Sequence, residues 1–118
     1  MSWLYSQSRG ELRRNGLLIG RGYSGAGRGK NNPRLEAIRD VGPIPRGHYR
    51  IGVVHNSDNT GPRVMNLRPI GHRAHGRISF EIHGDNTRHT ASRGCIIFPR
   101  VVRDRIAASG DTDLEVTR

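Results

Sequence analysis

Short runs of alternating apolar and polar residues, separated by glycine and proline, recur along the whole 118-residue chain. Alternation with a period of two is typical of strands that bury one face. Asn15-Gly16 is the strongest hairpin signal, because this dipeptide suits the tight turn between two strands. The pattern predicts strands within residues 3–8, 11–14, 17–19, 48–54, 63–70, 78–83, 96–98 and 113–117.

Helical patterns are short and few. Residues 33–39 are expected to form a helical turn, with Leu35 and Ile38 on one face. A helix is predicted over residues 99–109, because Pro99 suits a first helical position and Gly110 suits a C-terminal cap. We therefore predict a mainly β fold with one or two short helices.

Composition supports a single small β domain. Hydrophobic residues make up 33% of the chain and there are 16 glycines, which favours short strands and many turns. We expect one domain over residues 1–118, too small to carry a separate substrate-binding domain. Any active site must therefore lie on the core fold itself.

The charge balance is strongly basic. Lys and Arg number 20 against 10 Asp and Glu, and all the basic residues except Lys30 are arginine. Arginine favours bidentate contacts to carboxylate or phosphate, so the partner is expected to be polyanionic or rich in carboxylates. A basic nucleic-acid-binding module with a structural cysteine is the alternative. The six aromatic residues do not form the aromatic and basic ladder of single-strand binders.

The chain is expected to be made in the cytoplasm as a soluble protein. Its first residues lack the charged start and apolar run of a secretory signal, and no segment approaches the roughly 18 apolar residues of a membrane span. Work outside the cytoplasm would then need a dedicated export apparatus. The single cysteine excludes an internal disulfide.

Two other sites were considered from the sequence. The glycine-rich segment 20–33 could present backbone N–H groups to an anion. However, Gly29-Lys30 is followed by Asn31 instead of Ser or Thr, so it does not fit a nucleotide-binding loop. His72 and His75 lack a second close pair of ligands, so no metal site is predicted. No cofactor is predicted either.

The candidate chemistry lies at Cys95 and at His83, which ends a predicted strand twelve positions upstream. A thiol and an imidazole at neighbouring strand ends suit nucleophilic catalysis, with the imidazole as base. The second ring nitrogen needs an acceptor, either the Gly84 carbonyl, which we favour, or the Asp85 carboxylate. Gly94 allows a tight turn in which the N–H groups of Gly94 and Cys95 converge on an oxyanion, and Ser92 is positioned to hydrogen-bond across it.

Taken together these segments resemble the L,D-transpeptidase catalytic domain. Its signature is a histidine followed by glycine or serine, and then a Ser/Thr-x-Gly-Cys turn. His83-Gly84 and Ser92-Arg93-Gly94-Cys95-Ile96 match it. A longer ordered set is similar to the type VI secretion L,D-transpeptidase effector family: Gly22-Tyr23-Ser24-Gly25, Asn31-Asn32-Pro33, Val41 to Tyr49, His83-Gly84-Asp85-Asn86 and the cysteine turn.

The resemblance implies an L,D-transpeptidase-like β-sandwich or barrel that acts on peptidoglycan stem peptides. Cys95 would form a thioester with the third stem residue, and L,D-carboxypeptidase trimming or D-amino acid exchange would follow. It further implies action in the periplasm of a target cell after secretion, and a cognate immunity protein, with no specific nucleic acid and no membrane insertion. The implied catalytic set is Cys95, His83, Gly84, Ser92 and Gly94, and the implied substrate-binding set is Tyr23, Asp85, Asn86, Arg88 and Arg93.

Two positions depart from the familiar transpeptidase turn. That turn carries histidine before Gly-Cys and arginine or asparagine two residues after the cysteine, where this chain has Arg93 and Ile97. Substrate anchoring is therefore expected to fall to Arg88, Arg93 or Arg100.

Overall fold

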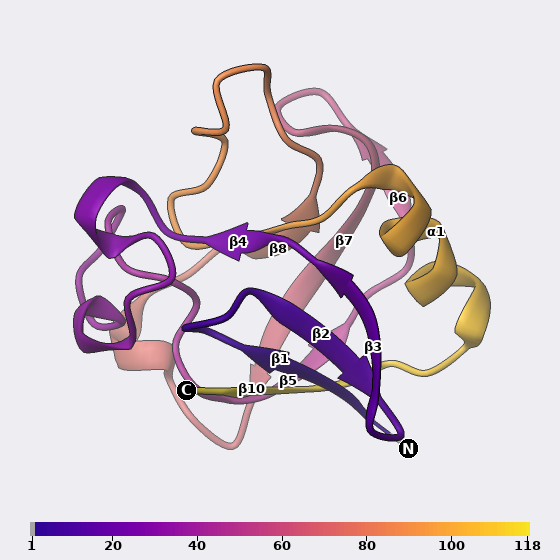
Figure 1. Ribbon diagram of the computed structural model, residues 1–118, viewed down its shortest axis with the longest axis horizontal. Coiled ribbons are helices and arrows are strands. Elements are labelled where there is room, and N and C mark those ends of the chain that lie inside the picture. The colour runs from indigo at the N-terminus through magenta and orange to yellow at the C-terminus, as the bar shows by residue number, and fades with distance from the viewer. Residues whose placement is uncertain (1) are drawn as a thin grey trace.

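The computed structural model describes residues 2–118, so the first residue of the expected domain, Met1, lies outside the described residues. Within this range the fold is mainly β: ten strands form a nearly closed, barrel-like sheet accompanied by a single α-helix (Figure 1). The fold class predicted from the sequence is confirmed. The strands are β1 (Trp3–Ser6), β2 (Glu11–Arg14), β3 (Leu17–Arg21), β4 (Tyr23–Ser24), β5 (Gly47–Ile51), β6 (His55–Ser57), β7 (Gly61–Ile70), β8 (Phe80–His83), β9 (Ile96–Ile97) and β10 (Asp113–Thr117).

The sheet follows the order β3-β2-β1-β10-β5-β7-β8-β9-β4, with β6 paired to β7 off this path. Its two end strands, β3 and β4, are separated in the chain only by Gly22. The two edges of the sheet therefore lie next to each other, which makes the barrel nearly closed. A Cβ atom on Gly22 would stand 1.7 Å from the carbonyl oxygen of Ile97, so only glycine fits where the chain crosses from one edge to the other.

The interior is filled by inward-facing side chains of the strands. Trp3, Tyr5, Leu12, Ile82 and Ile96 are all nearly inaccessible to solvent. Because successive strand residues point to opposite faces, this apolar set comes from alternate positions, as the sequence pattern predicts. Burial of this kind of surface is the main favourable contribution to folding.

The helix α1 (Arg100–Ser109) lies at one side of the barrel (Figure 1) and buries Val102 and Ile106. Pro99, predicted as the first helical residue, occupies the N-cap position, so the helix begins one residue later than predicted, at Arg100. Gly110 ends the helix with φ of 73°, in the left-handed region that favours glycine, as predicted.

Several predicted boundaries differ from the observed ones. The strand predicted over 78–83 begins only at Phe80, because Ser79 has φ of 68° and breaks the extended chain. Ile78 is consequently 79% exposed, although the alternation had placed it with Phe80 and Ile82 on a buried face. The helical turn expected over 33–39 is a 3₁₀ turn of residues 33–35. The strands β4 and β6 were not predicted, because they have only two and three residues.

Candidate active site

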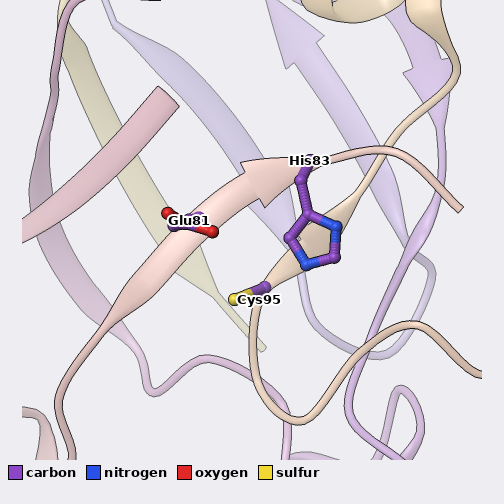
Figure 2. A group of neighbouring side chains, drawn as sticks. All are labelled: Glu81, His83 and Cys95. Carbon is purple, nitrogen blue, oxygen red and sulfur yellow. The ribbon is translucent and has the colours of Figure 1, made fainter. Parts of the chain in front are cut away.

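The parallel pairing of β8 with β9 brings the predicted nucleophile and base together. In this register Ile82 pairs with Ile96, and His83 pairs with Ile97. Cys95, immediately before β9, therefore comes next to Glu81 and His83, whose side chains lie on the face opposite to Ile82. One ligand atom of each of Glu81, His83 and Cys95 lies within 4.8 Å of the others (Figure 2).

His83 is held in one orientation by the backbone. Its ring is buried, and Nδ1–H donates a hydrogen bond of 2.8 Å to the carbonyl oxygen of Gly84. The acceptor for the second ring nitrogen is thus the Gly84 carbonyl and not the carboxylate of Asp85. The bond leaves Nε2 with its lone pair, and Figure 2 shows this side of the ring directed toward Cys95.

The Cys95 thiol is half-buried and donates to the carbonyl oxygen of Ser79 at 3.7 Å. Within residues 2–118 no hydrogen bond joins the thiol to the imidazole, so the two groups are close but unpaired. Burial raises the pKa of the thiol to about 11; the backbone amide of Glu81 lowers the value, the carboxylate of Glu81 raises it, and the charge of Arg77 lowers it. The resting thiol is therefore neutral at pH 7, and it needs a base at the moment of reaction.

This state of the thiol can be measured by alkylation. Because Cys95 is the only cysteine, the rate of its reaction with iodoacetamide reports the thiolate at this one site. With a pKa of about 11, we expect the rate to rise roughly 10³-fold from pH 7 to pH 10. An unstructured peptide with an ordinary cysteine, whose thiol pKa is about 8.5, should rise only about 30-fold over the same range. A rate for the protein that is constant above pH 7 would instead indicate a thiolate and imidazolium pair formed before substrate binds.

Ser92 holds the turn that carries the cysteine. Its Oγ accepts hydrogen bonds from the N–H groups of Gly25 (2.8 Å) and Gly94 (3.1 Å), and it donates to the carbonyl oxygen of Cys95 (2.6 Å). Ser24 Oγ donates to the carbonyl oxygen of Gly94 at 2.9 Å. Since the Gly94 N–H is already bonded to Ser92, the predicted oxyanion hole made of the Gly94 and Cys95 N–H groups lacks its first donor in this state.

The residues after His83 form a loop that Tyr23 anchors from β4. The Tyr23 hydroxyl donates to Asp85 Oδ1 at 2.5 Å and accepts from the Ala91 N–H at 3.0 Å. His89 Nδ1 lies 2.7 Å from Asp85 Oδ2. Burial would raise the pKa of Asp85, but the hydrogen bonds from Tyr23 and His89 outweigh it, so the pKa is lowered and the carboxyl stays ionised. Asp85 therefore shapes the loop and does not contact the His83 ring.

The remaining predicted substrate-binding residues are distributed unevenly. Asn86 Oδ1 accepts hydrogen bonds within the same loop, from the N–H groups of Arg88 and Thr90. The Arg88 side chain is exposed. Tyr23, Asp85 and Arg100 line one cavity together, whereas Arg93 lines a different one with Cys95. Of the arginines considered as anchors, Arg93 is the one that shares a pocket with the nucleophile.

The pocket beside Cys95 has a volume of about 310 Å³. Arg39, Arg77, Arg93 and Asp40 line it together with Cys95, so the pocket offers three cations and one carboxylate near the thiol. This set suits a ligand that carries both carboxylate and ammonium groups. Arg39 and Asp40 could not be predicted from the sequence, because nothing in their local pattern distinguishes them from other charged loop residues.

Arg77 is a further residue near the nucleophile that the sequence pattern did not predict. It is only 7% exposed, and its guanidinium donates four hydrogen bonds, to the carbonyl oxygens of Glu36, Gly42, Pro43 and Arg93. It thereby joins the distant segment 36–43 to the start of the cysteine turn. Its charge also lies close enough to the thiol to lower the pKa of Cys95. Only the tertiary structure reveals this role, because its partners are backbone atoms far away in sequence.

Within residues 2–118, one group of side chains has the spacing of metal ligands: Glu81, His83 and Cys95. The other histidines considered from the sequence have different partners: His72 Nε2 contacts the His48 carbonyl oxygen, and His75 Nε2 contacts Glu36. Any metal bound by the three would occupy the sulfur and imidazole that the proposed chemistry uses.

A protein-family model matches most of the chain. The family model described as Tlde1 domain matches residues 19–114 of the 118, and it represents the type VI secretion L,D-transpeptidase effectors. No curated protein matches the chain. The family implies an effector with L,D-transpeptidase-like activity toward peptidoglycan. Among the described residues no helix has the length and apolar character needed to cross a membrane.

Proposed function

The chain belongs to the Tlde1 domain family, and on this premise we propose that it is a cysteine enzyme that trims peptidoglycan tetrapeptide stems and exchanges their last residue. The nucleophile is Cys95 and the base is His83. The observation that carries the proposal is the closeness of the Cys95 sulfur, the only thiol of the chain, to an imidazole whose other nitrogen is fixed by the Gly84 carbonyl.

Acylation begins with transfer of the thiol proton to His83 Nε2. The sulfur attacks the carbonyl carbon between the third stem residue and D-alanine, and the resulting tetrahedral intermediate collapses with cleavage of the C–N bond. The imidazolium returns the proton to the departing nitrogen, so D-alanine leaves as an amine and a thioester remains on Cys95. The hydrogen bond from Nδ1 to Gly84 supports this step, because it keeps Nε2 free to accept and return the proton.

The thioester is then resolved by one of two nucleophiles. Water gives the trimmed tripeptide, which is L,D-carboxypeptidase activity, and a D-amino acid gives an exchanged tetrapeptide. In both cases His83 takes a proton from the nucleophile and transfers it to the leaving sulfur. The pocket containing Arg39, Arg93 and Asp40 supports this assignment, since its charges complement the carboxylates and amines of stem peptides.

The family also suggests the compartment in which this chemistry acts and the protein that would inhibit it. Type VI effectors of this kind are secreted, and action in the periplasm of a target cell fits a peptidoglycan substrate. A cognate immunity protein is the expected partner. With a net charge of +10 on the effector, an acidic inhibitor would complement its surface.

The direct test is to incubate the purified protein with disaccharide tetrapeptide and to weigh the products. We expect loss of the terminal alanine, and a transient protein adduct with the mass of the acyl group. The matched control is the same protein alkylated at its single cysteine, which should leave the substrate intact. An intact tetrapeptide with the unmodified protein would contradict the proposal. Steeply salt-dependent nucleic-acid binding that survives alkylation would then favour the alternative of a basic binding module.

A further inference from the structure

Glu81 occupies an unusual place for an acidic residue. Its carboxylate has an oxygen within 4.8 Å of both the Cys95 sulfur and an imidazole nitrogen of His83 (Figure 2). Its one hydrogen bond from another side chain comes from Thr60 Oγ1, at 3.0 Å. Within residues 2–118 it forms no ion pair, although the chain has twice as many basic as acidic residues.

This carboxylate does not help the first step of the proposed reaction. A negative charge beside the sulfur disfavours the thiolate, and the charge of the Glu81 carboxylate acts to raise the pKa of Cys95, whereas the backbone amide of Glu81 acts to lower it. The strand register fixes Glu81 at this place, and Thr60 orients it. The negative charge of Glu81 opposes formation of the thiolate. It does not oppose resolution of the thioester, because the sulfur is then acylated and uncharged.

We propose that Glu81 binds the ammonium group of the amino acid that resolves the thioester, and so directs the reaction toward exchange. This inference rests on the proposed function. An ammonium group held about 2.8 Å from a carboxylate oxygen would lie against the acylated sulfur, within reach of His83 Nε2. The proposed ligand is a D-amino acid, whose carboxylate suits the neighbouring arginines of the pocket, Arg39 and Arg93.

The step balances as follows. The bound ammonium loses one proton to water through the Glu81 carboxylate and becomes a free amine. The lone pair of this amine attacks the thioester carbon, a C–N bond forms and the C–S bond breaks. His83 Nε2 accepts a second proton from the nitrogen and delivers it to the departing sulfur. The products are a new amide and the restored thiol, and no oxidant or metal is required.

The test compares the two products at a fixed concentration of tetrapeptide and increasing concentrations of D-methionine. Mass spectrometry gives the ratio of exchanged to trimmed stem. In Glu81→Gln we expect this ratio to fall about tenfold, with a higher KM for D-methionine, because a charge-assisted contact to the amine is lost. Glu81→Asp keeps the charge and should recover part of the ratio. Glu115→Gln, on β10, is the matched control and should leave the ratio unchanged.

The possible outcomes separate this inference from the function on which it rests. A wild-type protein that trims the stem but never incorporates D-methionine overturns the role of Glu81 and the exchange branch of the proposed function, while trimming through Cys95 stands. An unchanged product ratio in Glu81→Gln overturns the role of Glu81 alone, since a purely structural residue would slow both products together. Tetrapeptide left intact by the wild-type protein contradicts the proposed function itself.

Discussion

Replacing Cys95 by alanine is expected to abolish the proposed release of alanine from tetrapeptide stems, with a loss of roughly 10⁴-fold or more in rate. The reason is that no thioester can form without the sulfur, and the chain has no second cysteine to replace it. The fold should persist. The side chain is small, only half-buried, and makes one weak hydrogen bond, to the Ser79 carbonyl.

The measurement is the same product assay, together with thermal unfolding of both proteins. Equal melting temperatures would show that activity is lost because the nucleophile is missing, and not because the variant is unfolded. His83→Gln provides a second comparison, because it keeps a polar side chain at the site but removes the base, and a similarly large loss is expected. If the Cys95→Ala protein trimmed the stem as fast as its parent, the nucleophile would have to be sought elsewhere in the molecule.

Replacing Gly22 by alanine should destabilise the protein by about 3 kcal/mol or more. The added Cβ would stand 1.7 Å from the Ile97 carbonyl oxygen and 2.7 Å from Phe98 Cδ1. Neither the backbone carbonyl nor the packed ring can yield without opening the contact between the two edges of the barrel. For a chain of this size we expect the melting temperature to fall by about 10 °C or more.

Gly52→Ala is the matched control for this prediction. The nearest atom to a Cβ at Gly52 is 3.4 Å away, which is ordinary contact, and its backbone conformation is open to other residues. The two variants make the same chemical change, so they differ only in the space around the added methyl group. Equal melting temperatures for the two variants would show that the backbone at Gly22 has room for a Cβ atom beside the Ile97 carbonyl oxygen.

The sequence predicted the regular part of the fold well. The segments 11–14 and 113–117 have the predicted boundaries, and Gly110 caps the helix, because alternation and capping are local properties of the chain. The short strand β4 was missed, since Tyr23-Ser24 becomes a strand only by pairing with β9 at the closing edge of the barrel. The exposed Ile78 was misplaced for a similar reason, because the left-handed conformation of Ser79 is imposed by tertiary structure.

The candidate site shows the same division between local and distant effects. Cys95, His83 and the Gly84 carbonyl could be proposed from the sequence, because each lies at a recognisable strand end or glycine turn. Glu81, Arg39 and Arg77 could not. Their positions near the nucleophile depend on the β8 and β9 register and on contacts between distant segments, which no local pattern reports.

The high pKa of the Cys95 thiol has a consequence for survival in an oxidising compartment. Peroxides attack the thiolate far faster than the neutral thiol, and oxidation beyond the sulfenic acid is irreversible. A cysteine that stays protonated at rest is therefore protected from inactivation during secretion. Because the chain contains no second cysteine, it also cannot be trapped in an internal disulfide on the way.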